Sequence, residues 1–242
     1  MVDKTAPNQS VVIDQIAASV AHAFNAIRNE SCVEALNKQL MAFEDALVEM
    51  ANVDGFLRDP SGQLGNPLTK HGEIAEVVEV GVRRARDLID EIPMSAHMDG
   101  IHRTGPADFV LNGVEAQSKF INGTASGLRA VLGHMESNTA FLNNGGVYVI
   151  PSDQYALIER VLRGDTDGMS AKTIRAIEQH IQKIGEHSGR PPLEVLKPSI
   201  SAYADVQPGN IENTMDRHGQ DLEERHEGRN EQIQEAHQAS LR

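Results

Sequence analysis

The sequence predicts an α+β or α/β protein, with a small mixed β-sheet flanked by helices, a helical hairpin before the sheet and a helical tail after it. Three observations support this prediction. Apolar residues recur at intervals of three and four over residues 10–50 and 69–92, which is the period of amphipathic helices. Around Asn112-Gly113 the pattern changes to alternation, which is typical of paired strands. Residues 210–240 are polar and lack proline, which favours a solvated helix.

Composition narrows the class of protein. The chain has 242 residues and 40% apolar residues, but only 4% are aromatic, so Leu, Ile, Val and Ala must fill the core. The net charge of −13 argues against indiscriminate nucleic-acid binding, although a local site remains open. The single cysteine, Cys32, excludes an internal disulfide and a multi-cysteine zinc site. Without a long apolar segment or a signal-like start, we expect a cytoplasmic protein with no membrane segment.

The N-terminal region, residues 1–53, is predicted to be a helical hairpin. The first helix covers residues 10–29. Ser31 and Glu34 have the spacing of a capping box, so we expect a second helix to begin there and to end near Met50. Residues 53–68 concentrate Gly, Pro, Asp and Asn and are predicted to form a loop.

Residues 65–190 are predicted to form the α/β core, and residues 191–242 a linker and charged helical tail. Four prolines, the last of them Pro208, indicate a loose connector before the tail. The tail is expected to lie outside the core, to be dispensable for any chemistry, and to bind a protein partner or a second copy. The elements expected in the core are a helix at 69–92 ended by Pro93, a strand near 94–102, strands on either side of Asn112-Gly113, a helix at 124–136, a strand at 147–150, and helices at 152–163 and 170–187.

The Asn-Gly turn allows the pairing of the two strands to be deduced. Both residues of a two-residue type I′ turn need positive φ, which Asn and Gly tolerate. Leu111 then pairs with Val114, and Asp108 lies opposite Gln117. Because strand side chains alternate, Glu115 and Lys119 share the face of Gln117, and the apolar residues mostly form the other face.

This polar face has an ordinary interpretation as a solvated surface. A second interpretation is chemical. A carboxylate facing an amide, with an ammonium beyond it, supplies oxygen ligands for a hard divalent cation and a group that activates water. The preceding helix carries Glu73, Glu76 and Glu79 at three-residue spacing, so one of these carboxylates could reach the same cation.

These residues resemble the PD-(D/E)xK nuclease superfamily, whose fold is restriction-endonuclease-like. The match consists of residues 70–76 on the helix (KHGEIAE), Asp108 on the first strand and Gln117-Ser118-Lys119 on the second, and it covers about residues 65–165. Gln117 departs from the pattern, because Glu is usual there and Gln removes a negative charge from the site.

The resemblance implies a metal-dependent nuclease, with DNA favoured over RNA as the substrate. Asp108 and Gln117 would bind Mg²⁺ or Mn²⁺, and Lys119 would position or deprotonate the attacking water. Glu76 or Glu73 would complete the site, and the spacing from Gly72 favours Glu76.

Three further residues are candidates for substrate binding. Arg103 could hold a phosphate, although it stands beside a Gly-Pro turn that needs no ligand. Thr124 begins a helix whose free N–H groups could receive a phosphate, and ordinary capping is the alternative. His71 is close in sequence to the acidic helix positions.

Two other functional classes remain open. One is a catalytically inactive nuclease fold or a helical scaffold that acts by binding protein or nucleic acid. The other is a nucleotide-modifying toxin that uses Arg103 and Glu115. No HExxH motif or phosphate-binding glycine loop is present, which argues against a zinc enzyme and against the commonest nucleotide-binding loops.

Overall fold

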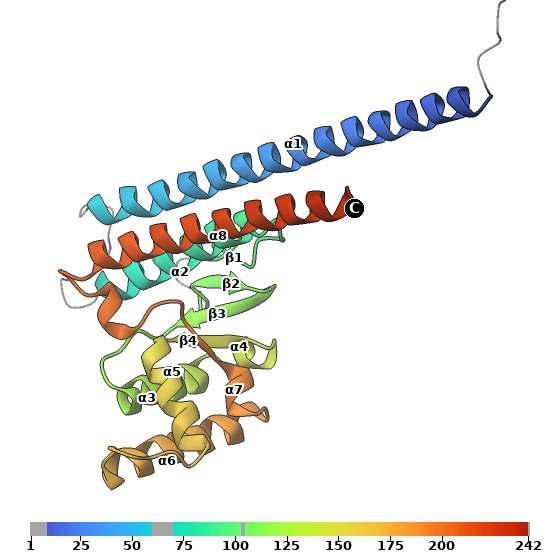
Figure 1. Ribbon diagram of the computed structural model, residues 1–242. Helices are drawn as coiled ribbons and strands as arrows, with labels where there is room; N and C mark the ends of the chain where they lie inside the picture. Colours follow the sequence, from blue (N-terminus) through green and yellow to red (C-terminus); the bar gives the residue numbers. More distant parts are fainter. Residues whose placement is uncertain (1–8, 60–69, 103–104, 242) are drawn as a thin grey trace, which may run out of the picture.

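The computed structural model describes residues 9–59, 70–102 and 105–241, and it confirms the predicted class (Figure 1). Within these residues a five-stranded mixed sheet lies between two groups of helices. On one side are α2 (Lys70–Ile89), α1 (Gln9–Arg58) and α8 (Ile211–Ser240). None of the described helices is long and apolar enough to cross a membrane. The other helices are α3 (Thr124–Ser137), α4 (Thr139–Asn143), α5 (Ser152–Leu162), α6 (Ala171–Ser188) and the short α7 (Pro192–Val195), with a 3-10 turn η1 (Tyr203–Val206).

The sheet confirms the predicted hairpin and its register. Asn112 and Gly113 have φ angles of 51° and 78°, as a type I′ turn requires, and Leu111 pairs with Val114. The first three strands are antiparallel, and the last two run parallel to the third. In spatial order the strands are β1 (Ala96–His97), β2 (Phe109–Leu111), β3 (Val114–Ser118), β4 (Val147–Ile150) and β5 (Leu196–Pro198).

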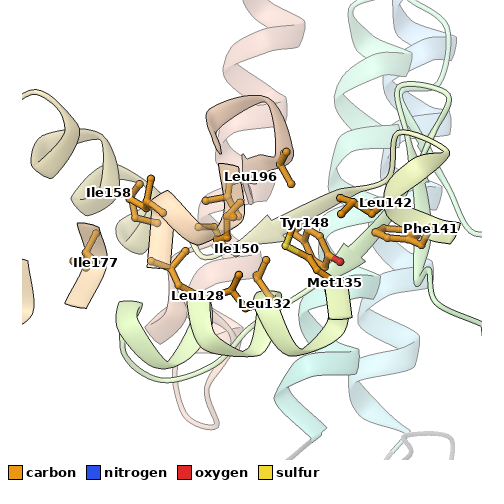
Figure 2. Close-up of a cluster of buried hydrophobic side chains, with 14 of the residues drawn as sticks. Leu128, Leu132, Met135, Phe141, Leu142, Tyr148, Ile150, Ile158, Ile177 and Leu196 are labelled. Atoms are coloured by element: carbon orange, nitrogen blue, oxygen red, sulfur yellow. The ribbon is translucent and has the colours of Figure 1, made fainter. Parts of the chain in front are cut away.

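Each face of the sheet has its own apolar core. Phe109, Ala116 and Val149 pack with Val80 of α2 on one face. On the other face Tyr148, Ile150 and Leu196 pack against α3, α4, α5 and α6, with Leu128, Met135 and Phe141 among their neighbours (Figure 2). The alternation of side chains along β4 therefore divides the molecule into two layers of helices.

The predicted N-terminal hairpin is wrong, because α1 is one continuous helix of 50 residues. Ser31, the predicted cap, is an exposed residue inside this helix. The capping spacing alone does not end a helix, and residues 28–35 contain neither Gly nor Pro. The end of α1 packs on α2, and it comes so close to Gly81 that a Cβ atom there would collide with Val53.

The predicted C-terminal helix is confirmed as α8 (Ile211–Ser240), but its predicted position outside the core is wrong, and so is the predicted linker. Residues 192–198 form α7 and the edge strand β5. α8 packs against α1 and α2, with Leu222 fully buried. Arg86 of α2 binds Asp221 of α8 at 2.8 Å, which joins the two helices further. The C-terminal region is therefore part of the fold, and residue 191 is not a boundary between independent units.

Candidate metal centre

The open end of the β2–β3 hairpin brings the predicted site residues together. Asp108 comes directly before β2, and Gln117 lies near the end of β3. The side-chain amide of Gln117 donates a hydrogen bond to Oδ2 of Asp108. The backbone N–H of Ser118 donates to the same oxygen at 2.7 Å. The register of the hairpin thus fixes the position of the Asp108 carboxylate.

Glu76 of α2 completes this arrangement from the neighbouring helix. Its carboxyl group shares a hydrogen bond with the Asp108 carboxylate. Burial, together with the negative charges of Asp108 and Glu73, raises the pKa of Glu76 from its usual value to about 8. Glu76 is therefore protonated at neutral pH and donates to Asp108, although the charge of Lys119 opposes the shift.

Lys119 lies beside both carboxylates. Burial lowers the pKa of its ammonium group, while the charges of Asp108 and Glu76 oppose that shift. Burial also raises the pKa of Asp108, against the hydrogen bond from Ser118 and the charge of Lys119. All three groups are thus partly removed from water. Their electrostatic interactions are therefore stronger than those between groups at the surface.

A cleft of about 370 Å³ opens onto the two carboxylates. Its acidic wall consists of Glu73, Glu76 and Asp108. The rest of the lining is apolar, so the acids are the main polar groups that a ligand in the cleft would meet. The apolar lining residues are Phe56 at the end of α1, together with Val77, Met98, Ile101 and Ala107.

The other acidic candidates take different positions. Glu79 is buried away from the cleft, where it accepts hydrogen bonds from Arg83 and Ser199 at 2.6 Å each. Three helical residues turn a side chain by about 300°, so each successive Glu of the stripe moves some 60° around α2. Glu115 is exposed on β3, nearer to the turn than Gln117.

The predicted substrate-binding residues receive little support. The Nε2 atom of His71 lies 3.0 Å from the carbonyl oxygen of Phe120, so this ring ties α2 to the segment after β3. Thr124 is buried in the first turn of α3 and is not among the described residues that line the cleft. Arg103 lies outside the described residues, so the Arg103–Glu115 alternative has no geometry to support it.

Sequence reasoning missed a second polar group behind Lys119. Nδ1 of His134, on α3, lies 2.9 Å from the hydroxyl of Tyr148, and the ring also donates to the carbonyl of Pro106. Burial, followed by the charge of Lys119, lowers the pKa of His134. Tyr148 stands opposite Gln117 in the β3–β4 pairing, a register that the sequence does not reveal.

The site is not preassembled as a conventional metal cluster. Within the three described ranges, no three His, Cys, Asp or Glu side chains are arranged to hold a metal ion. The donor chemistry nevertheless suits a hard cation, because Glu76 and Asp108 offer adjacent carboxylate oxygens and Glu73 borders the same cleft.

Comparisons with known proteins add no relative to this description. No protein family matches the chain, and neither curated proteins nor solved structures yield a match. The functional assignment therefore depends on the geometry of this site.

Proposed function

We propose that the protein is a metal-dependent nuclease that cleaves phosphodiester bonds with Mg²⁺ or Mn²⁺. The observation that carries this proposal is the meeting of two half-buried carboxyl groups, Glu76 of α2 and Asp108 before β2, which line one cleft beside Lys119. The preference for DNA over RNA rests on the resemblance to PD-(D/E)xK nucleases. A cytoplasmic location, where Cys32 would stay reduced, fits this proposal.

The shared proton supports a cation at this position. Two carboxyl groups in contact and shielded from water cannot both ionise without a compensating positive charge. A divalent cation would replace the proton and allow Glu76 and Asp108 to bind it as carboxylates, with Glu73 as a third acidic neighbour. Gln117 donates to Asp108, so its main role would be to hold that carboxylate, and only its amide oxygen would be free to bind the metal.

The side chains divide the work of hydrolysis. When bound, the metal neutralises charge that develops on the phosphate. Burial favours the neutral amine of Lys119, and in that form Lys119 would orient the attacking water and accept its proton at Nζ. Ser118 and Gln117 would keep the Asp108 carboxylate in place throughout.

Cleavage of DNA tests the proposal directly. Purified protein would be incubated with plasmid and with single-stranded DNA in Mg²⁺, Mn²⁺ or EDTA. We expect cleavage with either metal and none in EDTA. Lys119→Ala and Asp108→Ala should each lower the rate by about 10²–10⁴-fold while the protein keeps its helical circular dichroism. Glu115→Ala is the matched control, because Glu115 is an exposed residue of the same hairpin.

Metal binding gives a readout that does not depend on cleavage. Titration calorimetry with Mn²⁺ at pH 7, in buffers of different ionisation enthalpy, should show release of about one proton, because Glu76 must deprotonate to bind. Glu76→Gln should weaken binding and abolish proton release. Mn²⁺ binding without proton release, equal in wild type and Glu76→Gln, would show that the cation binds elsewhere.

A scaffold function is the second candidate. The observation that favours it is the run of exposed apolar residues on α1, which the nuclease proposal does not use. If wild type, Lys119→Ala and Asp108→Ala are equally inactive on DNA and RNA with every divalent metal, the scaffold function replaces the enzyme.

A further inference from the structure

The N-terminal part of α1 extends beyond the rest of the molecule. α1 and α8 run antiparallel, and α8 ends at Ser240, level with Ile27. Residues 9–26 of α1, here called the overhang, continue past that end, and no other described helix lies beside them (Figure 1). At 1.5 Å per residue the overhang is about 27 Å long.

The overhang carries an exposed apolar row. Val20 is 48% exposed, Phe24 is 57% exposed and Ile27 is 59% exposed. The row leads into a mostly apolar groove of about 400 Å³ between α1 and the end of α8, lined by residues that include Cys32 and Ile233. The surface of α1 that α8 covers therefore continues into the overhang, where α8 no longer covers it.

Such a helix needs a packing partner. A helix of this length is marginally stable in water by itself, and most helical stability in proteins comes from burial of an apolar face. We propose that this face binds the overhang of a second copy of the chain, in antiparallel orientation.

The spacing of the side chains makes the overhang complementary to itself. Ala17, Val20, Phe24, Ile27 and Ser31 follow the alternating three- and four-residue spacing of a coiled-coil seam. An antiparallel pair centred on residue 22 sets Phe24 opposite Val20 of the second copy, and Ile27 opposite Ala17. Each large side chain then meets a smaller one, and the twofold axis repeats both contacts.

Charge favours a second copy over other partners. Asp14 is the only charged residue from 9 to 27, although the whole chain has a net charge of −13. Two overhangs can therefore meet with little repulsion, whereas a basic peptide or a nucleic acid would find few charges to contact. The outer face of α1, by contrast, mixes the exposed Leu40 and Met41 with acidic residues such as Glu44, which would repel another copy.

A short helix pair buries a small interface, so we expect a micromolar dissociation constant for the dimer.

Sedimentation velocity of the full chain from 1 to 200 µM tests the proposal. Wild type should pass from monomer to dimer over this range. Val20→Asp should weaken the dimer at least tenfold, whereas Leu40→Asp should leave it unchanged. The two positions are a matched pair, since both are on α1 and both are 48% exposed. A monomer at 200 µM, or a dimer that is lost in Leu40→Asp and kept in Val20→Asp, would overturn the proposal.

Disulfide cross-linking tests the orientation even if Val20→Asp alters folding. In a Cys32→Ser background, an equimolar mixture of Val20→Cys and Phe24→Cys proteins should give mainly the mixed cross-linked dimer. Efficient cross-linking of each protein with itself, without excess mixed dimer, would contradict the antiparallel register.

Discussion

The Glu76 carboxyl group donates a hydrogen bond to Asp108, so the two acids hold one proton between them at neutral pH. Glu79, three residues further along α2, is buried and forms an ion pair with Arg83 at 2.6 Å. The same helix thus presents one acid whose pKa burial raises and another that accepts hydrogen bonds from Arg83, Ser199 and Ile200.

Glu76→Gln should stabilise the metal-free protein at alkaline pH. The folded pKa of about 8 exceeds the unfolded value near 4.5, so the contribution of Glu76 to stability is full below pH 4.5 and is lost as pH rises through 8. Gln resembles the protonated form at every pH. At pH 8.5 in EDTA we expect the variant to be more stable than wild type by on the order of 3 kcal/mol in urea unfolding. Equal slopes of stability against pH for the two proteins would refute this.

Glu79→Gln should have the opposite effect. Glu79 is 1% exposed and accepts hydrogen bonds from Arg83, from Ser199 and from the N–H of Ile200 at 2.9 Å. The Gln side chain leaves Arg83 without its ion-pair partner, so we expect a loss of about 2–4 kcal/mol in the free energy of unfolding. Urea unfolding at pH 7 measures this loss. A variant as stable as wild type would mean that the Glu79–Arg83 pair contributes nothing to the free energy of unfolding.

His218 should make the protein sensitive to acid. Burial, followed by the charge of Arg86, lowers its pKa to about 4, while Asp221 and Asp205 oppose and Arg217 adds to the shift. The folded pKa of His218 is below the unfolded value near 6.5. Its contribution to the free energy of unfolding is therefore fully present above pH 6.5 and is lost as the pH falls towards 4. His218→Gln should remove about 2–3 kcal/mol of the difference in stability between pH 7 and pH 4.5. His22→Gln, at an exposed position, should change nothing.

Leu222→Ala should destabilise the whole protein. Leu222 of α8 is fully buried against residues of α1 and α2, including Met50 and Val82. Truncation leaves a cavity in this layer, and we expect a loss of about 3 kcal/mol. Ala236→Ser, near the exposed end of α8, is the control. If thermal unfolding is unchanged in Leu222→Ala, the C-terminal helix is dispensable, as its polar composition had indicated.

The hairpin could be predicted from the sequence because its determinants are local. Asn112-Gly113 selects the turn, the turn selects the register, and the register sets Asp108 beside Gln117. The contact of Glu76 with Asp108 is not determined in the same way, because helix spacing alone does not show which Glu faces the sheet. That choice depends on how α2 is rotated against β2 and β3, which is a tertiary property.

Other parts of the fold depend on contacts that the sequence does not display. The polar composition of α8 gives no sign that Leu222 is buried. A helix that packs against two others needs only a narrow buried stripe, so most of its residues can be polar. The prolines near residue 195 indicated a connector, yet β5 tolerates Pro198 because it is an edge strand. Ser31 and Glu34 have capping spacing, but without a helix breaker α1 continues through them.

The length of α1 has a geometric consequence for the proposed dimer. Phe56, near one end of this helix, lines the cleft, whereas the seam is centred on residue 22, about 50 Å away along the helix axis. The two clefts of a dimer would then lie roughly 100 Å apart along the joined rods, a span of about 30 base pairs at 3.4 Å per step. Two clefts this far apart could not act together at one position, so each subunit of the proposed dimer would act on its own.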